Sequence, residues 1–101
     1  MAVVDYLVKF LEKKNLTFET MKKYEETKLK EILYTLNDSI YGEVLRAKGA
    51  VLNNEEKWID LDFTPGKTNI TAGNTNIIGK IIVIGKRLNK DAIGDLFKQA
   101  R

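Results

Sequence analysis

Residues 41–63 read YGEVLRAKGAVLNNEEKWIDLDF, which is two runs of alternating side chains separated by the polar turn 53–56. In the first run, the two faces carry Leu45, Ala47 and Val51 on one side and Val44, Arg46 and Lys48 on the other. In the second run, they carry Ile59, Leu61 and Phe63 on one side and Trp58, Asp60 and Asp62 on the other. Because successive side chains of a strand point to opposite faces, this pattern predicts an antiparallel hairpin with one apolar face and one mixed face.

Further elements flank this hairpin on both sides. Apolar stripes predict helices over residues 3–13, 26–36 and 89–100, and alternation predicts short strands over residues 16–21 and 67–71. Residues 76–84 are apolar on both faces, so we expect a central strand that is covered on both sides. The order predicts an α+β fold of two layers, with helices packed on one face of a mostly antiparallel sheet of four to five strands.

The composition fits one compact domain over residues 1–101, with residues 1–14 forming an additional N-terminal amphipathic helix. The chain contains neither cysteine nor histidine. It therefore lacks the ligands that zinc, copper, nickel and cobalt prefer, and it lacks the commonest general base near neutral pH. We expect no metal site, no cofactor and no catalytic residue, and a protein that is not an enzyme.

The charges argue against two classes of partner. The formal net charge is +3, and the signs are interspersed, as where Lys22 and Lys23 are followed by Glu25 and Glu26. Nucleic-acid-binding proteins concentrate their cations on one face, so we expect no nucleic acid. The N-terminal residues resemble neither a signal peptide nor a membrane span, so we expect a cytoplasmic protein that does not bind membranes.

A phosphate-binding loop is excluded by spacing and by context. Gly66, Lys67 and Thr68 match the last three positions of such a loop, but Leu61 stands where its first glycine is required. The residues that follow have a strand pattern, whereas the loop must lead into a helix whose amides point at the phosphates. We expect no binding of GTP through a phosphate loop.

The polar face of the hairpin is the candidate binding site. A turn centred near Asn54 predicts Lys48 opposite Asp60 and Arg46 opposite Asp62. These charges are interpreted either as cross-strand ion pairs or, together with Val44 and Trp58, as a recognition surface, and the two roles are compatible. Catalysis by the two carboxylates is not expected, because a flat face offers no pocket and the neighbouring cations keep both ionised.

Several blocks of sequence together suggest a relative. These are YGEVLRAKG at 41–49, KWIDLDF at 57–63, the Pro65-Gly66 turn, GKIIVIG at 79–85, LNKD at 88–91 and Leu96-Phe97. Their succession resembles the C-terminal domain of the CobW family, over about residues 16–97. In that family an R-A-K-G strand, a tryptophan strand and a G-x-x-x-V-I-G strand precede the last helix.

The resemblance implies a fold and a limited range of functions. CobW proteins are GTP-dependent metallochaperones linked to cobalamin biosynthesis or metal homeostasis, and their N-terminal GTPase domain carries the phosphate loop and a cysteine-rich metal site. This sequence lacks both features and the histidine-rich linker often found between the halves. The resemblance therefore implies an accessory domain of CobW C-terminal type, without GTP hydrolysis or metal delivery.

Two hypotheses of different classes follow. The first is a non-enzymatic interaction domain that binds a protein partner through the sheet face carrying Val44, Arg46, Lys48, Trp58, Asp60 and Asp62. The resemblance suggests a CobW-type GTPase domain or a metal- or corrinoid-dependent protein as that partner, and a homodimer is also possible. The alternative is a module that binds a small ligand, a corrinoid or an anion, with Arg46 and Lys48 as charged anchors.

Overall fold

The computed structural model describes residues 13–99. The elements are β1 (Lys13–Thr20), β2 (Lys23–Tyr24), α2 (Glu26–Thr35), the 3-10 helix η1 (Ser39–Tyr41), β3 (Glu43–Asn53), β4 (Trp58–Thr64), β5 (Lys67–Ala72), β6 (Gly79–Lys86) and α3 (Lys90–Gln99). An N-terminal helix was predicted over residues 1–14, and its first twelve residues lie outside the described part of the chain. Its predicted end is wrong, because residues 13 and 14 already belong to β1 and pair with β6.

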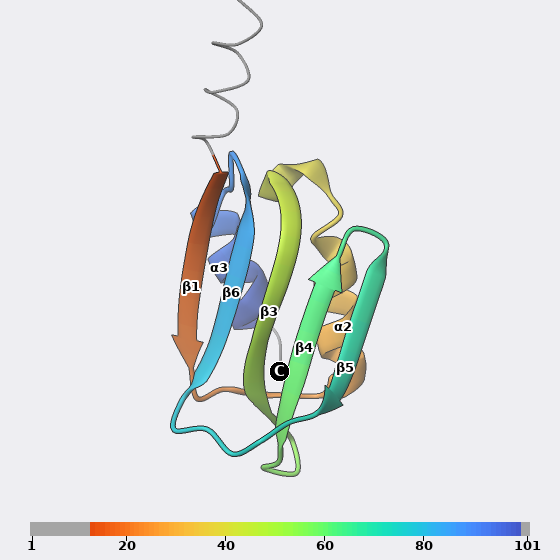
Figure 1. The fold of residues 1–101 in the computed structure, drawn as a ribbon, viewed down its shortest axis with the longest axis vertical. Helices are drawn as coiled ribbons and strands as arrows, with labels where there is room; N and C mark the ends of the chain where they lie inside the picture. The colour runs from red at the N-terminus through yellow and green to blue at the C-terminus, as the bar shows by residue number, and fades with distance from the viewer. Residues whose placement is uncertain (1–12, 100–101) are drawn as a thin grey trace, which may run out of the picture.

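The sheet has the strand order β1-β6-β3-β4-β5, and β2 adds a two-residue parallel pairing at the end of β3. All other pairs are antiparallel. Both α2 and α3 pack on the same side of the sheet, behind it in the view of Figure 1. The predicted α+β fold of two layers is therefore confirmed, with the short β2 bringing the number of strands to six.

The core lies between the helices and the inner face of the sheet. Its fully buried members include Leu29, Leu33 and Leu36 from the α2 region, Ile93 from α3, and Ala47, Val51, Phe63, Ile81 and Val83 from the strands. The helical residues recur at three- and four-residue spacing and the strand residues at alternate positions, as the sequence predicted. This arrangement leaves the opposite side of the sheet without a helical cover among the described residues.

The central strand β6 differs from its prediction. Its inward residues Ile81 and Val83 are fully buried, but Ile82 and Ile84 on the other side are only half-buried. Ile77, which was expected in the same strand, lies in the loop before β6 and is 97% exposed. Coverage on both sides is therefore wrong for the described residues, because both helices pack against a single face.

The hairpin of β3 and β4 has a different register from the predicted one. Lys48 lies opposite Asp62, and Ala50, not Lys48, lies opposite Asp60. The turn lies further along the chain, at residues 54–57, because the Asn53 side chain accepts hydrogen bonds from the backbone N–H groups of Glu55 (2.9 Å) and Lys57 (3.0 Å). Glu56 adopts a left-handed conformation with φ of 62°. The turn is consequently centred on Glu55 and shifts the pairing by two residues.

A β-bulge at the start of β3 changes the direction of one predicted site residue. Val44 pairs with Gly85 and Arg46 with Ile84, so that Leu45 is an extra residue in β3. An extra residue breaks the alternation of side chains. Val44 is therefore buried in the core, 5% exposed, rather than on the polar face with Arg46.

Candidate functional site

The side of the sheet away from the helices is the candidate site, and we call it the open face. Its side chains in the three central strands are Arg46, Lys48, Ala50 and Leu52 of β3, Trp58, Asp60 and Asp62 of β4, and Lys80, Ile82 and Ile84 of β6. Trp58 and the two isoleucines are half-buried, whereas Lys48, Asp60 and Lys80 are exposed. The open face thus combines apolar and charged side chains without a described element above it.

One ion pair organises the charges of this face. The Arg46 guanidinium donates hydrogen bonds from Nε to Asp62 Oδ1 at 3.3 Å and from Nη2 to Asp62 Oδ2 at 3.1 Å. This pair was predicted from the sequence and is confirmed, although it forms diagonally across the ladder. Among residues 13–99, neither Lys48 nor Asp60 forms a salt bridge, so the second predicted pair is wrong.

The charged residues surround a shallow depression of about 510 Å³. Its charged lining consists of Arg46, Lys48, Asp60, Asp62 and Lys80, and Asn74 and Asn76 of the β5–β6 loop close one side. Gly73 brings that loop against β4, because its N–H donates to the Trp58 carbonyl at 3.0 Å. Cations and carboxylates share the depression, which suits a partner surface carrying both signs of charge.

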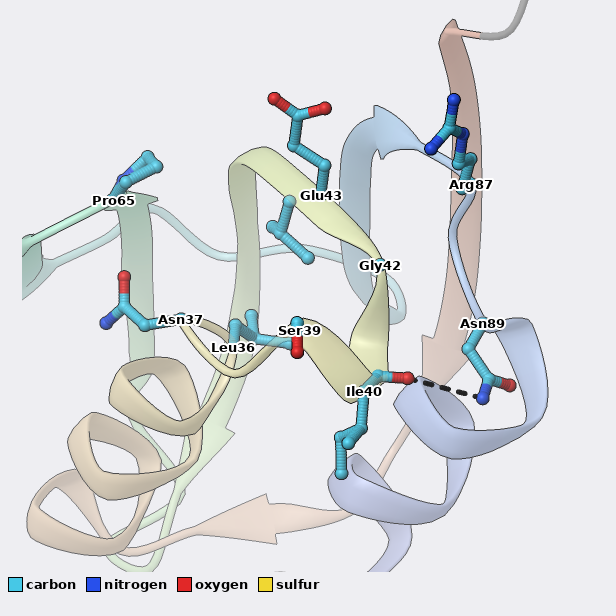
Figure 2. Close-up of a pocket in the computed structure, with 10 residues that line it drawn as sticks. Leu36, Asn37, Ser39, Ile40, Gly42, Glu43, Pro65, Arg87 and Asn89 are labelled. Carbon is cyan, nitrogen blue, oxygen red and sulfur yellow. Dashed lines mark hydrogen bonds between the residues drawn. The ribbon is translucent and has the colours of Figure 1, made fainter.

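The structure brings five of the six predicted site residues together on the open face, and Val44 is the exception. Val44 instead lines a separate cleft of about 620 Å³ at the end of the sheet. In this cleft Asn37 and Pro65 lie on one side and Arg87 and Asn89 on the other, with Ser39 and Ile40 between them (Figure 2).

Backbone geometry shapes this cleft. Gly42 has φ of 91°, and an added Cβ would lie 2.4 Å from the Arg87 carbonyl oxygen, so that only glycine fits there. The Asn89 side chain donates to the Ile40 carbonyl at 3.3 Å and so connects η1 to the start of α3 (Figure 2). The cleft was not predicted from the sequence, because its lining comes from separate turns that have no periodic pattern. Gly42 was the one residue type in the sequence that pointed to a close backbone approach here.

The described part of the chain has neither a metal-binding cluster nor a membrane-spanning helix. Residues 13–99 contain no cluster of three or more acidic side chains placed to hold a metal ion. None of the helices between residues 13 and 99 has the length and apolar character needed to cross a membrane.

Comparison with solved structures finds a clear likeness in fold. The chain is similar to the Zn(II)-bound YjiA GTPase from E. coli, with a TM-score of 0.72, 15% sequence identity and 89% of this chain covered. A Zn(II)-bound triple mutant of YjiA gives a TM-score of 0.73 and 14% identity. The fold is that of a CobW-type C-terminal domain. At this identity the likeness shows the fold alone.

YjiA is a much longer chain than this one. The chain spans 30% of the length of YjiA, so most of the YjiA chain has no counterpart here. No family profile matches the sequence. No curated protein matches it either.

Proposed function

We propose that this chain is a non-enzymatic interaction domain that binds a protein partner through the open face. The observation that carries the proposal is a sheet surface that no described element covers. Half-buried Ile82 and Ile84 lie there beside the strand that carries Arg46 of the Arg46–Asp62 pair, and half-buried Trp58 lies further along β4 on the same face. Tryptophan and arginine are enriched in protein interfaces, and apolar groups beside polar ones are typical of their anatomy.

The proposed partner is a CobW-type GTPase domain. Support comes from the fold shared with part of YjiA, which is named a GTPase and is a much longer chain. A metal- or corrinoid-dependent protein is the other partner that the resemblance implies. A role connected with cobalamin or metal homeostasis and a cytoplasmic location both stay predictions.

The open face favours a protein partner over an anion. Asp60 and Asp62 line the same depression as the cations and would repel an anionic ligand, and Arg46 is already paired with Asp62. Of the three cations that line the depression, Lys48 and Lys80 form no salt bridge with any described residue. The alternative, binding of a corrinoid or an anion, predicts heat on titration with cobalamin or phosphate, which Lys48→Glu would abolish.

The proposal is tested by titrating the isotope-labelled chain with a purified CobW-type GTPase domain that lacks its own C-terminal domain. We expect NMR shifts at the amides of β3, β4 and β6. Trp58→Ala and Lys48→Glu should weaken binding at least tenfold, as expected for residues near the centre of an interface.

Matched substitutions on the helical side serve as controls. Tyr34 is 72% exposed on α2 and Lys30 is exposed on the same helix, so Tyr34→Ala and Lys30→Glu remove an exposed aromatic ring and reverse a charge away from the open face. These variants should bind normally. Shift changes confined to α2 and α3, or equal losses for both sets of variants, would show that the open face is not the binding surface.

A further inference from the structure

The strand β1 lies at an edge of the sheet, and its outer side has no neighbour among the described residues. The outer side of an edge strand presents a row of unpaired backbone donors and acceptors, which natural proteins cover, block or use for pairing. β1 extends over eight residues and contains no proline. The other edge, β5, is shorter, with six residues.

Half-buried apolar side chains gather beside this edge. Six such residues pack against the core, and all except Ile70 lie on β1, on α3 or just before α3: Leu16, Phe18, Leu88, Ala92 and Leu96. The ring of Phe18 contacts that of Phe97 in α3, with a centroid distance of 6.2 Å. We call this surface the β1–α3 flank, and its apolar character makes the β1 edge suited to an interface.

The sequence of β1 is self-complementary in an antiparallel pairing. Residues directly opposite in a ladder lie on the same face, so a twofold axis must pass through a residue of the strand. An axis at Thr17 places Leu16 opposite Phe18 of a second copy, twice, and Thr17 opposite its own equivalent. Apolar–aromatic and Thr–Thr pairs are both stabilising cross-strand neighbours. An axis at Leu16 would instead place Lys14 opposite Phe18.

Pairing of this kind also brings the two α3 helices together. Because the helices lie on the same side of both sheets, the axis places the two α3 helices next to each other and antiparallel, behind the paired strands (Figure 1). Asp91 is in the first turn of α3 and Lys98 is in the last, and both are exposed. An antiparallel arrangement therefore places the acidic end of each helix beside the basic end of the other.

We propose that this chain forms a twofold-symmetric homodimer through β1, with a continuous sheet across the axis at Thr17 and the two α3 helices packed behind it. The inference is independent of the proposed function, since it uses a strand edge and leaves the open face accessible. It also places two open faces side by side on one extended sheet.

Oligomeric state tests the proposal directly. Sedimentation equilibrium should give a mass twice that of the 11.5 kDa chain. Thr17 is exposed, so the monomer tolerates charge there. Thr17→Asp and Thr17→Lys each place like charges directly across the axis and should raise the dissociation constant about fivefold or more. An equimolar mixture of the two variants should recover the dimer as a heterodimer.

Cross-linking fixes the register. The chain contains no cysteine, so Thr17→Cys introduces a single thiol that should form an intermolecular disulfide on mild oxidation. Asn69→Cys, exposed on the other edge strand β5, is the matched control and should stay monomeric under the same conditions. A monomeric wild-type chain at millimolar concentration overturns the proposal. A dimer that resists both Thr17 charge variants, or that cross-links equally through Asn69→Cys, overturns it as well.

Discussion

Arg46 is joined to Asp62 by two hydrogen bonds, of 3.3 and 3.1 Å, although Lys48 is the residue directly opposite Asp62. The long arginine side chain reaches diagonally across the ladder, and its planar fork matches the carboxylate. Both side chains are about half exposed, at 49% and 48%. The pair therefore sits in a solvent-accessible part of the open face, where water weakens its energy.

We expect the Arg46–Asp62 pair to contribute little to stability. Arg46→Ala should lower the free energy of unfolding by no more than about 1 kcal/mol, and the effect should shrink at 1 M salt. A double-mutant cycle with Asp62→Ala, followed by urea denaturation, measures the coupling. A coupling energy well above 1 kcal/mol would show that the pair is a structural clamp rather than a surface contact.

Two glycines in regular elements should respond in opposite directions to alanine. At Gly49 in β3, an added Cβ would lie 2.0 Å from the Lys80 carbonyl oxygen, so that backbone must move, and Gly49→Ala should cost roughly 3 kcal/mol or more. At Gly94 in α3, the nearest atom is Phe18 Cε1 at 3.4 Å, an ordinary contact. Gly94→Ala should therefore stabilise the fold by about 0.5–1 kcal/mol through helix propensity. Thermal unfolding of both variants checks the signs.

Tyr24 should make stability fall at alkaline pH. Burial raises the pKa of the Tyr24 hydroxyl, opposed in part by a hydrogen bond with Thr20, and the hydroxyl donates to the Phe97 carbonyl at 3.1 Å. The unfolded chain then releases this proton first, near pH 10, so the free energy of unfolding declines as the pH rises above that value.

Tyr24→Phe isolates this effect. The variant should lose about 1 kcal/mol at pH 8, because the Phe97 carbonyl loses its donor. Its stability should decline less steeply than that of the wild type between pH 9.5 and pH 11, roughly the range in which tyrosine ionises. Equal slopes for Tyr24→Phe and the wild type in urea titrations would contradict the assignment.

Asn53 should determine the register of the hairpin. It is 7% exposed, and Asn53→Ala removes the acceptor of two backbone N–H groups in the turn. We expect a loss of about 1–2 kcal/mol, whereas Asn54→Ala at the exposed neighbouring position should be nearly neutral. Chemical denaturation compares the two. Equal effects would mean that the side-chain bonds of Asn53 do not hold the turn.

The elements with strong periodicity were predictable from the sequence. The apolar stripes in residues 26–36 and 89–100 predicted α2 and α3, and Asn89 caps α3, since its Oδ1 accepts from the Ala92 N–H at 3.1 Å. The alternation of β4 placed Trp58, Asp60 and Asp62 on the correct face, because no irregularity interrupts that strand. The strand β2 was not predicted, because two residues are too few to show an alternating pattern.

The predictions that were wrong depend on structural features that the periodicity of apolar residues does not reveal. Val44 was assigned to the wrong face because Leu45 is a bulge, an extra residue in β3 that has no partner in β6. The residue types in the strand do not indicate where such a bulge lies. The predicted register was wrong because the Asn53 side chain and the left-handed residue Glu56 fix the position of the turn. The cleft beside Arg87 depends on tertiary contacts between distant turns, which no local pattern describes.

The position of β6 between β1 and β3 has a consequence for synthesis on the ribosome. The hairpins β3–β4 and β4–β5 join neighbouring segments and can form while the chain is still being translated. By contrast, Thr20 pairs with Gly79 and Lys13 with Lys86, so β1 must wait until β6 has emerged before it can join the sheet. Closing so long a loop is entropically costly and slows folding. The nascent chain therefore exposes Leu16 and Phe18 until β6 has been synthesised, and chaperones can bind this strand during that interval.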